Sequence, residues 1–374
     1  MSNLDYIEKL LNGSEVRWKP LELVAKIKHG KDWKKLNSGD IPVYGSGGIM
    51  EYVDTYSYDK PTVLIPRKGS ITNIFYLDTP FWNVDTIFYT EIDTTKVVPK
   101  YLYYFIKTID LMRLDTGSGR PSLTQAILNK LEMPIPCPDD PESSLQIQAE
   151  IVRILDAFTE LTAELNAELI TRKQQYAYYS EQLFTFEEGE VEWKALGDLA
   201  ENLDSKRKPI TSGLRESGDI PYYGASGIVD YVKDYIFNGD YLLVSEDGAN
   251  LIARNTPIAF SISGKNWVNN HAHVLKFETY AERRYVEYYL NSIDLTPYIS
   301  GAAQPKLNQK NLNSIKIPSP SLKEKERIVT ILDKFDDLTT SVTEGLPREI
   351  ELRQQQYEYY RKLLLSFPKL KGEA

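Results

Sequence analysis

The chain has 374 residues, of which 42% are apolar and 26% are charged, and its formal net charge is −9. This length suggests two or three domains with ordinary packed cores, and the acidic balance disfavours a uniformly basic nucleic-acid-binding protein. Cys137 is the only cysteine, which excludes an intrachain disulfide and a cysteine zinc cage. No apolar run is long enough to predict a membrane span. The acidic N-terminus does not resemble a signal peptide, so the sequence predicts a cytoplasmic protein.

Residues 1–144 predict a mixed α/β domain. A Trp-Lys pair at 18–19 precedes the loop GDIPVYGSGGIMEYV at 39–53. The runs TVLIP, NIFYL and DTIFYTEI are separated by Gly, Asn, Asp and Pro turns, a pattern typical of short strands. Residues 99–112 predict a short helix. Together these elements predict an α+β fold with a mainly antiparallel sheet.

A long helical region is predicted over residues 145–188. Ile151, Leu155, Phe158 and Leu165 recur at a spacing of three to four residues, which places them on one face of a helix. A helix of about 40 residues is roughly 60 Å long. One helix cannot bury this apolar face alone, so a second helix is expected beside it.

The second half of the chain repeats the first. GDIPYYGASGIVDYV at 218–232 matches the earlier loop at ten of fifteen positions, and VEWKAL answers VRWKPL. Residues 189–320 therefore predict a second α/β domain, and 321–374 a second helical region with Ile328, Leu332 and Phe335 on its apolar face. The Gly-Leu-Pro sequence at 345–347 predicts a kink or a short loop in that helix.

The two helical regions are expected to pair. The tyrosines at helical spacing are predicted either to pack this bundle or to dock partner subunits; they are Tyr176, Tyr179, Tyr357 and Tyr360. The N-terminal segment 6–18 is similar to 178–193, where the first helix leads into the second domain. Residues 1–13 are therefore predicted to form a short helix that completes the C-terminal helical region.

This duplicated order resembles the specificity subunit of type I restriction-modification enzymes. The similarity rests on motifs that occur twice in the same order: W-K-x-L, G-D-I-P-x-Y-G, R-P-S-L-T or Q-P-K-L-N, and I-x-x-I-L-D-x-F. The resemblance implies two pseudo-twofold-related target-recognition domains separated by an antiparallel helical coiled coil. Each domain would read one half of a bipartite, asymmetric double-stranded DNA site. Two methyltransferase subunits would dock on the helices, and two motor-nuclease subunits would join for cleavage.

Three loops in each half are candidate DNA contacts. The best pair is Arg120 and Gln304, which occupy equivalent positions, because arginine pairs with guanine and glutamine with adenine through two hydrogen bonds. Structural turns and a solvated hairpin tip remain the alternative interpretations. The candidate DNA-contacting residues are Tyr44, Ser46, Arg67, Lys68, Ser70, Ser118, Arg120, Ser122, Tyr223, Ser226, Asp247, Asn250, His271, Gln304, Lys306 and Asn308.

The sequence predicts recognition without chemistry. His271 and His273 alternate on a predicted strand, within a segment (269–273) aligned with 83–87, so their rings should face opposite sides and no metal site is expected. Phosphate-loop, methyltransferase and HExxH motifs are missing, so no catalytic residue and no cofactor is predicted. The competing hypothesis is a coiled-coil scaffold that carries two protein- or carbohydrate-binding modules.

Overall fold

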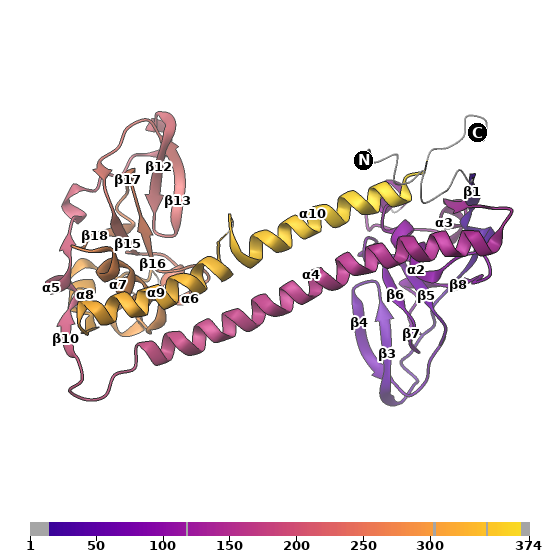
Figure 1. Cartoon of the computed structure of the whole chain (residues 1–374), viewed down its shortest axis with the longest axis horizontal. Coiled ribbons are helices and arrows are strands. Elements are labelled where there is room, and N and C mark those ends of the chain that lie inside the picture. The colour runs from indigo at the N-terminus through magenta and orange to yellow at the C-terminus, as the bar shows by residue number, and fades with distance from the viewer. Residues whose placement is uncertain (1–14, 117–118, 302–303, 342, 368–374) are drawn as a thin grey trace. The chain divides into compact units, whose positions relative to one another are not determined.

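The protein is described by a computed structural model that covers residues 15–116, 119–301, 304–341 and 343–367. The chain divides into two compact units, residues 1–165 with 350–374 and residues 166–349. The division falls within two helices, α4 (Pro141–Leu183) and α10 (Gly345–Leu365), so each unit combines a β-rich domain with parts of the long helices (Figure 1). The helix expected over residues 1–13 lies outside the described residues.

The described residues of the N-terminal domain form three small sheets. One has the order β2-β8-β5-β6 and is antiparallel throughout; a second has the order β4-β3-β7, in which β3 and β7 run parallel; β1 pairs with β9. The strands are β1 (Val16–Pro20), β2 (Ala25–Lys28), β3 (Ser38–Gly45), β4 (Gly48–Val53), β5 (Thr62–Pro66), β6 (Phe75–Leu77), β7 (Trp82–Asn83), β8 (Ile87–Ile92) and β9 (Glu132–Pro136). The short helices are η1 (Leu21–Leu23), α2 (Pro99–Ile106), η2 (Leu111–Leu114) and α3 (Gln125–Asn129).

The C-terminal domain repeats this plan. Its sheets have the orders β11-β18-β15-β16, β13-β12-β17-β14 and β10-β19. The strands are β10 (Glu192–Ala195), β11 (Glu201–Asn202), β12 (Ser217–Gly224), β13 (Gly227–Val232), β14 (Phe237–Asn238), β15 (Tyr241–Ser245), β16 (Ala259–Ile262), β17 (Lys265–Val268), β18 (Ala272–Lys276) and β19 (Lys316–Ser319). The short helices are α5 (Leu196–Leu199), η3 (Asp204–Lys206), η4 (Ser212–Leu214), α6 (Asn250–Ala253), α7 (Tyr280–Ser292), η5 (Thr296–Tyr298) and α8 (Gln309–Ser314). The predicted mixed α/β class with mainly antiparallel sheets is confirmed.

The Trp-Lys motif closes each domain. Trp18 on β1 lies opposite Pro134 on β9, and Trp193 on β10 lies opposite Pro318 on β19. The first strand of each domain therefore pairs with the strand that leads into the following helix. This pairing explains why the Trp-Lys motif and the proline-containing strand before the long helix, more than 100 residues apart in the chain, recur together in both halves.

The long helices pair within each unit. In the first unit Phe158 of α4 stacks on Tyr360 of α10, with ring centroids 5.2 Å apart. In the second unit Tyr176 and Tyr179 of α4 contact Phe335 of α9 (Leu322–Thr339) at 6.2 and 5.9 Å. Residues early in α4 thus pair with α10 and residues late in α4 pair with α9, which is the predicted antiparallel sense. None of the helices in the described part of the chain is both long and apolar enough to cross a membrane.

The apolar face of each helix also completes a domain core. Ile151 and Leu155 are fully buried in the core of the N-terminal domain, and Ile328 and Leu332 are fully buried in that of the C-terminal domain. Leu165 on α4 is half-buried. Four of the predicted stripe residues therefore join helix to domain, in addition to the pairing of helices.

The predicted interruption of the second helical region is confirmed. α9 ends at Thr339 and α10 begins at Gly345. Gly345 has a φ of 74°, and a Cβ there would lie 2.3 Å from the carbonyl oxygen of Asp337. Only glycine tolerates both this conformation and this approach. The break precedes the Gly-Leu-Pro sequence, and Pro347 falls in the first turn of α10, where proline is tolerated.

The aspartate of each I-L-D motif fastens a long helix to its domain. Tyr104 on α2 donates its hydroxyl hydrogen to Asp156 on α4 at 2.6 Å, and Tyr288 on α7 donates to Asp333 on α9 at 2.7 Å. A cation joins each pair: Lys100 lies 2.7 Å from Asp156, and Arg284 lies 3.0 Å from Asp333. The I-L-D motif thus recurs because the same contact between helix and domain, a tyrosine and a cation on one aspartate, is formed in both halves.

Tyr104→Phe should lower the free energy of unfolding of the first unit by about 1–2 kcal/mol, because a hydrogen bond to a carboxylate is lost. Denaturant titration measures this change. Tyr179→Phe is the matched control, since Tyr179 is exposed and its contacts are with the rings of Tyr178 and Phe335. Equal destabilisation by the two variants would contradict the assigned joint.

Candidate nucleic-acid interface

Hydrogen bonds bring the predicted loops of the N-terminal domain together. Leu123 N–H donates to the carbonyl of Arg67 at 2.8 Å, which places the third loop beside the second. Ser46, in the first loop, donates its N–H to Oγ1 of Thr86 at 3.3 Å, while Arg67 N–H donates to the carbonyl of Thr86 at 2.8 Å. The turn that contains Thr86 therefore connects all three loops into one surface.

The C-terminal domain repeats these connections. Leu307 N–H donates to the carbonyl of Glu246 at 2.8 Å, and Glu246 N–H donates to the carbonyl of His271 at 2.9 Å. Oγ of Ser245 donates to the carbonyl of Ala225 in the first loop. The backbone bond to the first loop is also repeated, since Val84 N–H donates to the carbonyl of Tyr44 at 3.0 Å and Asn269 N–H donates to that of Tyr223 at 3.1 Å. The same backbone frame thus holds three loops together in both halves. We call these the N-terminal and C-terminal loop surfaces.

The expected correspondence between segments 83–87 and 269–273 is wrong by one residue. The carbonyl of Thr86 accepts from Arg67, and that of His271 accepts from Glu246, so His271 corresponds to Thr86 and not to Asp85. The histidine alternation is as predicted: His271 is exposed, whereas His273 on β18 is fully buried.

Charges differ between equivalent positions of the second loop. In the N-terminal loop surface Arg67 forms an ion pair with Asp85, and Nζ of Lys68 lies 3.8 Å from the same carboxylate. In the C-terminal loop surface the position equivalent to Lys68 holds Asp247, whose carboxylate lies 2.9 Å from Nδ1 of His271. One surface therefore offers hydrogen-bond donors where the other offers acceptors.

Arg120 and Gln304 are exposed in the third loop of their domains. The described part of the chain provides no hydrogen bond or ion pair to either side chain. Lys306 is also exposed, and its Nζ lies 3.0 Å from Glu246. Ser122 is half-buried, and its N–H donates to Asp115 at 2.7 Å. Neither side chain is therefore committed to a partner among the described residues, and Ser118 lies outside them.

Several other candidates also serve the fold. Tyr44 and Tyr223 are half-buried, and their rings pack against Phe75 and Phe260 at 5.6 and 6.1 Å. Burial raises the pKa of both tyrosines. Ser70 and Ser226 are exposed.

Two asparagines of the C-terminal loop surface fix local backbone. The side chain of Asn250 bonds the backbone of Thr256 at 3.0 and 3.1 Å, and closes that loop. The side chain of Asn308 caps α8 by accepting from Asn311 N–H at 3.0 Å. Both amides lie at the loop surface with part of their hydrogen-bonding capacity already used.

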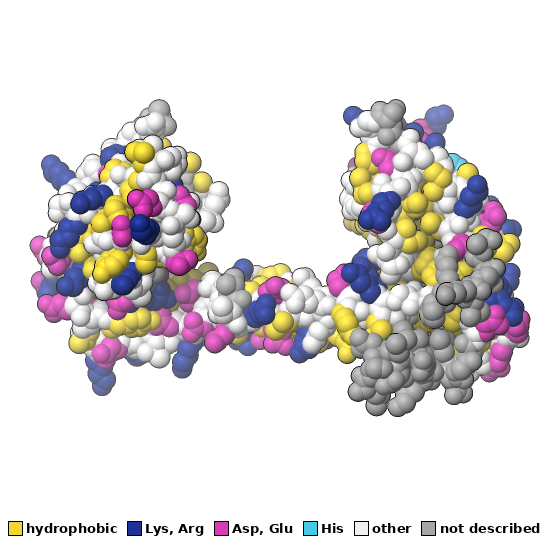
Figure 2. Space-filling view, turned by 90° about the horizontal axis from the view of Figure 1, so that it is seen from above, with side chains coloured by type: hydrophobic (Ala, Val, Ile, Leu, Met, Phe, Trp, Pro, Cys, Tyr) yellow, Lys and Arg dark blue, Asp and Glu magenta, His cyan; other side chains and the backbone are white. Residues whose placement is uncertain are grey.

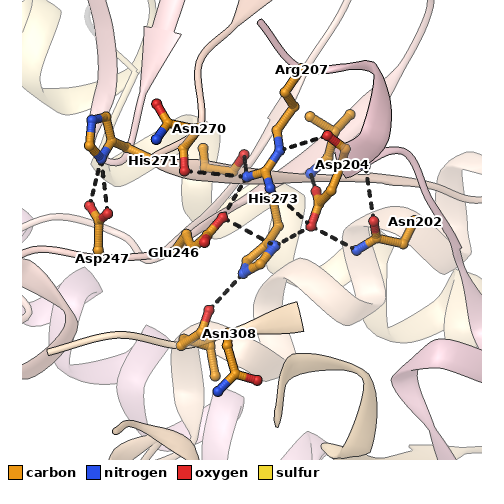
Figure 3. Close-up of polar contacts among 12 residues, drawn as sticks. Asn202, Asp204, Arg207, Glu246, Asp247, Asn270, His271, His273 and Asn308 are labelled. Carbon is orange, nitrogen blue, oxygen red and sulfur yellow. Dashed lines mark hydrogen bonds and ion pairs between the residues drawn. The ribbon is translucent and has the colours of Figure 1, made fainter. Parts of the chain in front are cut away.

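Beneath the C-terminal loop surface lies an ion cluster that the local sequence pattern does not reveal. Arg207 donates to Glu246 at 2.6 Å and lies 3.4 Å from Asp204 (Figure 3). Nδ1 of His273 lies 2.5 Å from Asp204, and its Nε2 lies 2.7 Å from the carbonyl of Leu307. We call Asp204, Arg207, Glu246 and His273 the buried ion cluster.

Three members of the buried ion cluster have the chemistry of metal ligands. Asp204, Glu246 and His273 each offer one ligand atom, and these atoms lie within 4.8 Å of one another. However, the guanidinium of Arg207 already contacts both carboxylates and supplies the positive charge there. Both ring nitrogens of His273 are already in contact with protein oxygens, Nδ1 with Asp204 and Nε2 with the carbonyl of Leu307. The arrangement is that of an ion cluster.

The cluster makes the C-terminal domain sensitive to acid. Burial raises the pKa of Glu246, but hydrogen bonds from Arg207 and Lys306 outweigh it, so the net pKa is lowered. Burial likewise opposes the effect of His273 and Arg207 on Asp204, whose net pKa is also lowered. A carboxylate with a lowered pKa stabilises the folded state above its unfolded pKa, and this contribution disappears as pH falls through the folded value.

The free energy of unfolding of the second unit should therefore fall as pH drops below about 4.5. Glu246→Gln should be less stable at neutral pH and should lose less stability in that acid window, since one titrating carboxylate is gone. Unfolding titrations from about pH 7 to about pH 3 test this. Parallel curves for the two proteins would show that Glu246 makes no such contribution.

The chain thus carries one domain plan twice, each copy with the same loop arrangement and each packed against long helices. A family model described as the type I restriction modification DNA specificity domain matches residues 15–172 and again residues 188–352. The chain is 37% identical to the EcoR124I/EcoR124II specificity subunit of Escherichia coli, across 99% of this chain and 98% of that one. It is 35% identical to a putative type I specificity subunit of Haemophilus influenzae, across 98% and 99%. The chain belongs to the family of type I restriction-modification specificity subunits.

Solved structures share the fold. The S subunit of a type I restriction-modification system from M. genitalium superposes with a TM-score of 0.65 at 17% identity, over 96% of this chain and 98% of that chain. At this identity the similarity concerns architecture alone. The predicted fold class, two α/β domains with long helices, is thereby confirmed.

Proposed function

We propose that this chain is the non-catalytic DNA-specificity subunit of a type I restriction-modification system. Each loop surface reads one half of a bipartite, asymmetric DNA site, and the paired helices set the distance between the halves. The observation that carries this proposal is the repeated backbone frame with different side chains on it. Lys68 and Arg120 on the N-terminal loop surface correspond to Asp247 and Gln304 on the C-terminal one. Two readers of unlike sequences require this combination.

The helices are the proposed docking region for two methyltransferase subunits, and two restriction subunits complete the assembly. Tyr179 and Tyr360 support this part of the proposal, since both remain substantially exposed although each stacks on a ring of the neighbouring helix. The acidic chain, with a net charge of −9, would bind DNA with the help of positive charge from its partners. The complex would act in the cytoplasm.

Methylome sequencing tests the proposal. Cells that express this chain with its cognate methyltransferase should acquire methylation at one gapped, non-palindromic motif, and cells that express the methyltransferase alone should not. DNA binding by the purified complex should also weaken steeply with salt, because phosphate contacts release counterions. Methylation that does not depend on this chain would reject the proposal in favour of a scaffold with protein- or carbohydrate-binding modules.

A further inference from the structure

Each domain exposes a matching set of apolar side chains on one hairpin. The N-terminal hairpin, β3–β4 with the residues that follow to 56, exposes Ile49, Met50, Tyr52 and Tyr56. The C-terminal hairpin, β12–β13 with the residues to 235, exposes Ile228, Val229, Tyr231 and Tyr235. All eight side chains are between 46% and 56% exposed. Figure 2 shows hydrophobic side chains reaching the surface of both units among charged ones.

The hairpins are alike where the loop surfaces differ. Four exposed apolar positions recur at the same place in each hairpin, and three of the four carry the same residue type. At the second and third loops of the loop surface the side chains change from Lys68 to Asp247 and from Arg120 to Gln304. A surface that contacts different base sequences in the two halves would diverge. A surface that is the same in both halves is suited to the same partner twice.

The charge of the hairpins indicates whether their partner is DNA or a protein. Residues 38–56 contain three acidic residues and no lysine or arginine, and residues 217–235 contain three acidic residues and one lysine. DNA binding depends on positive charge against the phosphates. The turn of each hairpin, at 45–48 and 224–227, belongs to the loop surface. The stretches beyond the turns, 49–56 and 228–235, each carry two acidic residues beside the exposed apolar side chains, with one lysine in the second. They are suited to a protein whose facing surface is apolar with basic residues around it.

The position of the exposed strands supports a protein partner. β4 and β13 are edge strands of their sheets among the described residues. An uncovered edge with apolar side chains promotes aggregation, so proteins usually cover such an edge or charge it. Contiguous apolar groups on an edge strand are also a common docking site for another chain. If one partner molecule binds each hairpin, the apolar edge strand is covered and a docking site for another chain is used.

We propose that the N-terminal and C-terminal hairpins each dock one copy of the same protein partner through these apolar side chains. The partner's matching surface is apolar with a basic rim. This inference rests on the proposed function, because that function names the partner to be tested, the cognate methyltransferase subunit. It assigns to the sheet domains a docking role beyond that of the helices.

The stoichiometry of the complex tests this inference. The full chain should bind two methyltransferase subunits. Ile49→Ser with Tyr52→Ser should weaken one of the two binding events by about tenfold or more, since exposed aromatic and aliphatic anchors dominate interfaces. Ile228→Ser with Tyr231→Ser should weaken the other, and the fourfold variant should weaken both. Titration followed by native mass spectrometry and sedimentation measures this without DNA.

Leu23→Ser is the matched control, because Leu23 is 57% exposed in the N-terminal domain but lies outside the hairpin. It should leave both binding events unchanged. Glu51→Lys, which retains the apolar set and reverses one rim charge, should also weaken a single event. Two undiminished binding events in a folded fourfold variant would overturn the inference, as would weakened DNA binding with intact stoichiometry. A failure of the proposed function is separate, because it is read from the methylation motif.

Discussion

Arg207→Ala should lower the free energy of unfolding of the second unit by about 3 kcal/mol. The guanidinium donates to Glu246 at 2.6 Å and to the carbonyl of Ala272 at 2.8 Å, and it lies 3.4 Å from Asp204. Its removal leaves two largely buried carboxylates with one histidine between them, and the exposed Lys306 as the remaining cation beside Glu246. Leaving buried carboxylates with only part of their compensating charge costs more stability than the ion pair itself contributes.

Hydrogen exchange measured separately for each unit checks this effect. Protection should fall across the second unit and remain unchanged in the first. Arg67→Ala is the matched control: it removes an arginine that pairs with the mostly exposed Asp85, so it should cost at most about 1 kcal/mol. A similar loss from Arg67→Ala and Arg207→Ala would show that burial does not distinguish the two ion pairs.

Arg120→Ala should relax sequence preference in one half-site and leave the other half-site intact. The guanidinium is exposed in the third loop, beside the loop that carries Arg67. Loss of one bidentate arginine–guanine pair costs about 1–3 kcal/mol of discrimination. Methylation motifs from cells that express the variant would show degeneracy at one position. Gln304→Ala should produce the complementary change in the other half-site.

Arg113→Ala is the control for this experiment. Arg113 is highly exposed and pairs locally with Asp110, so its removal takes away a similar charge outside the third loop. It should leave the motif unchanged. Uniform weakening of all sequences by Arg120→Ala would assign its guanidinium to phosphate and would remove it from the base-reading set.

The sequence by itself was sufficient to predict the features that depend on local patterns of residues. The duplication, the strands, the long helix α4 and the break before Gly345 follow from periodicity and turn chemistry, which act over a few residues. The I-L-D and Trp-Lys motifs were visible as repeats. Their role as joints was not, because Tyr104 and Asp156 are 52 residues apart.

Only the tertiary structure decided what surrounds each loop. The buried ion cluster combines Asp204, Glu246 and His273, which lie on separate segments, and no pattern in a single segment predicts their approach. The ion pair between Asp85 and Arg67 likewise joins two segments that are distant in the chain, so the sequence did not predict it. Local sequence determines which elements form, because backbone preferences and apolar periodicity are local. Sheet pairing determines which polar side chains meet and which apolar ones, such as Ile49 and Ile228, remain in solvent.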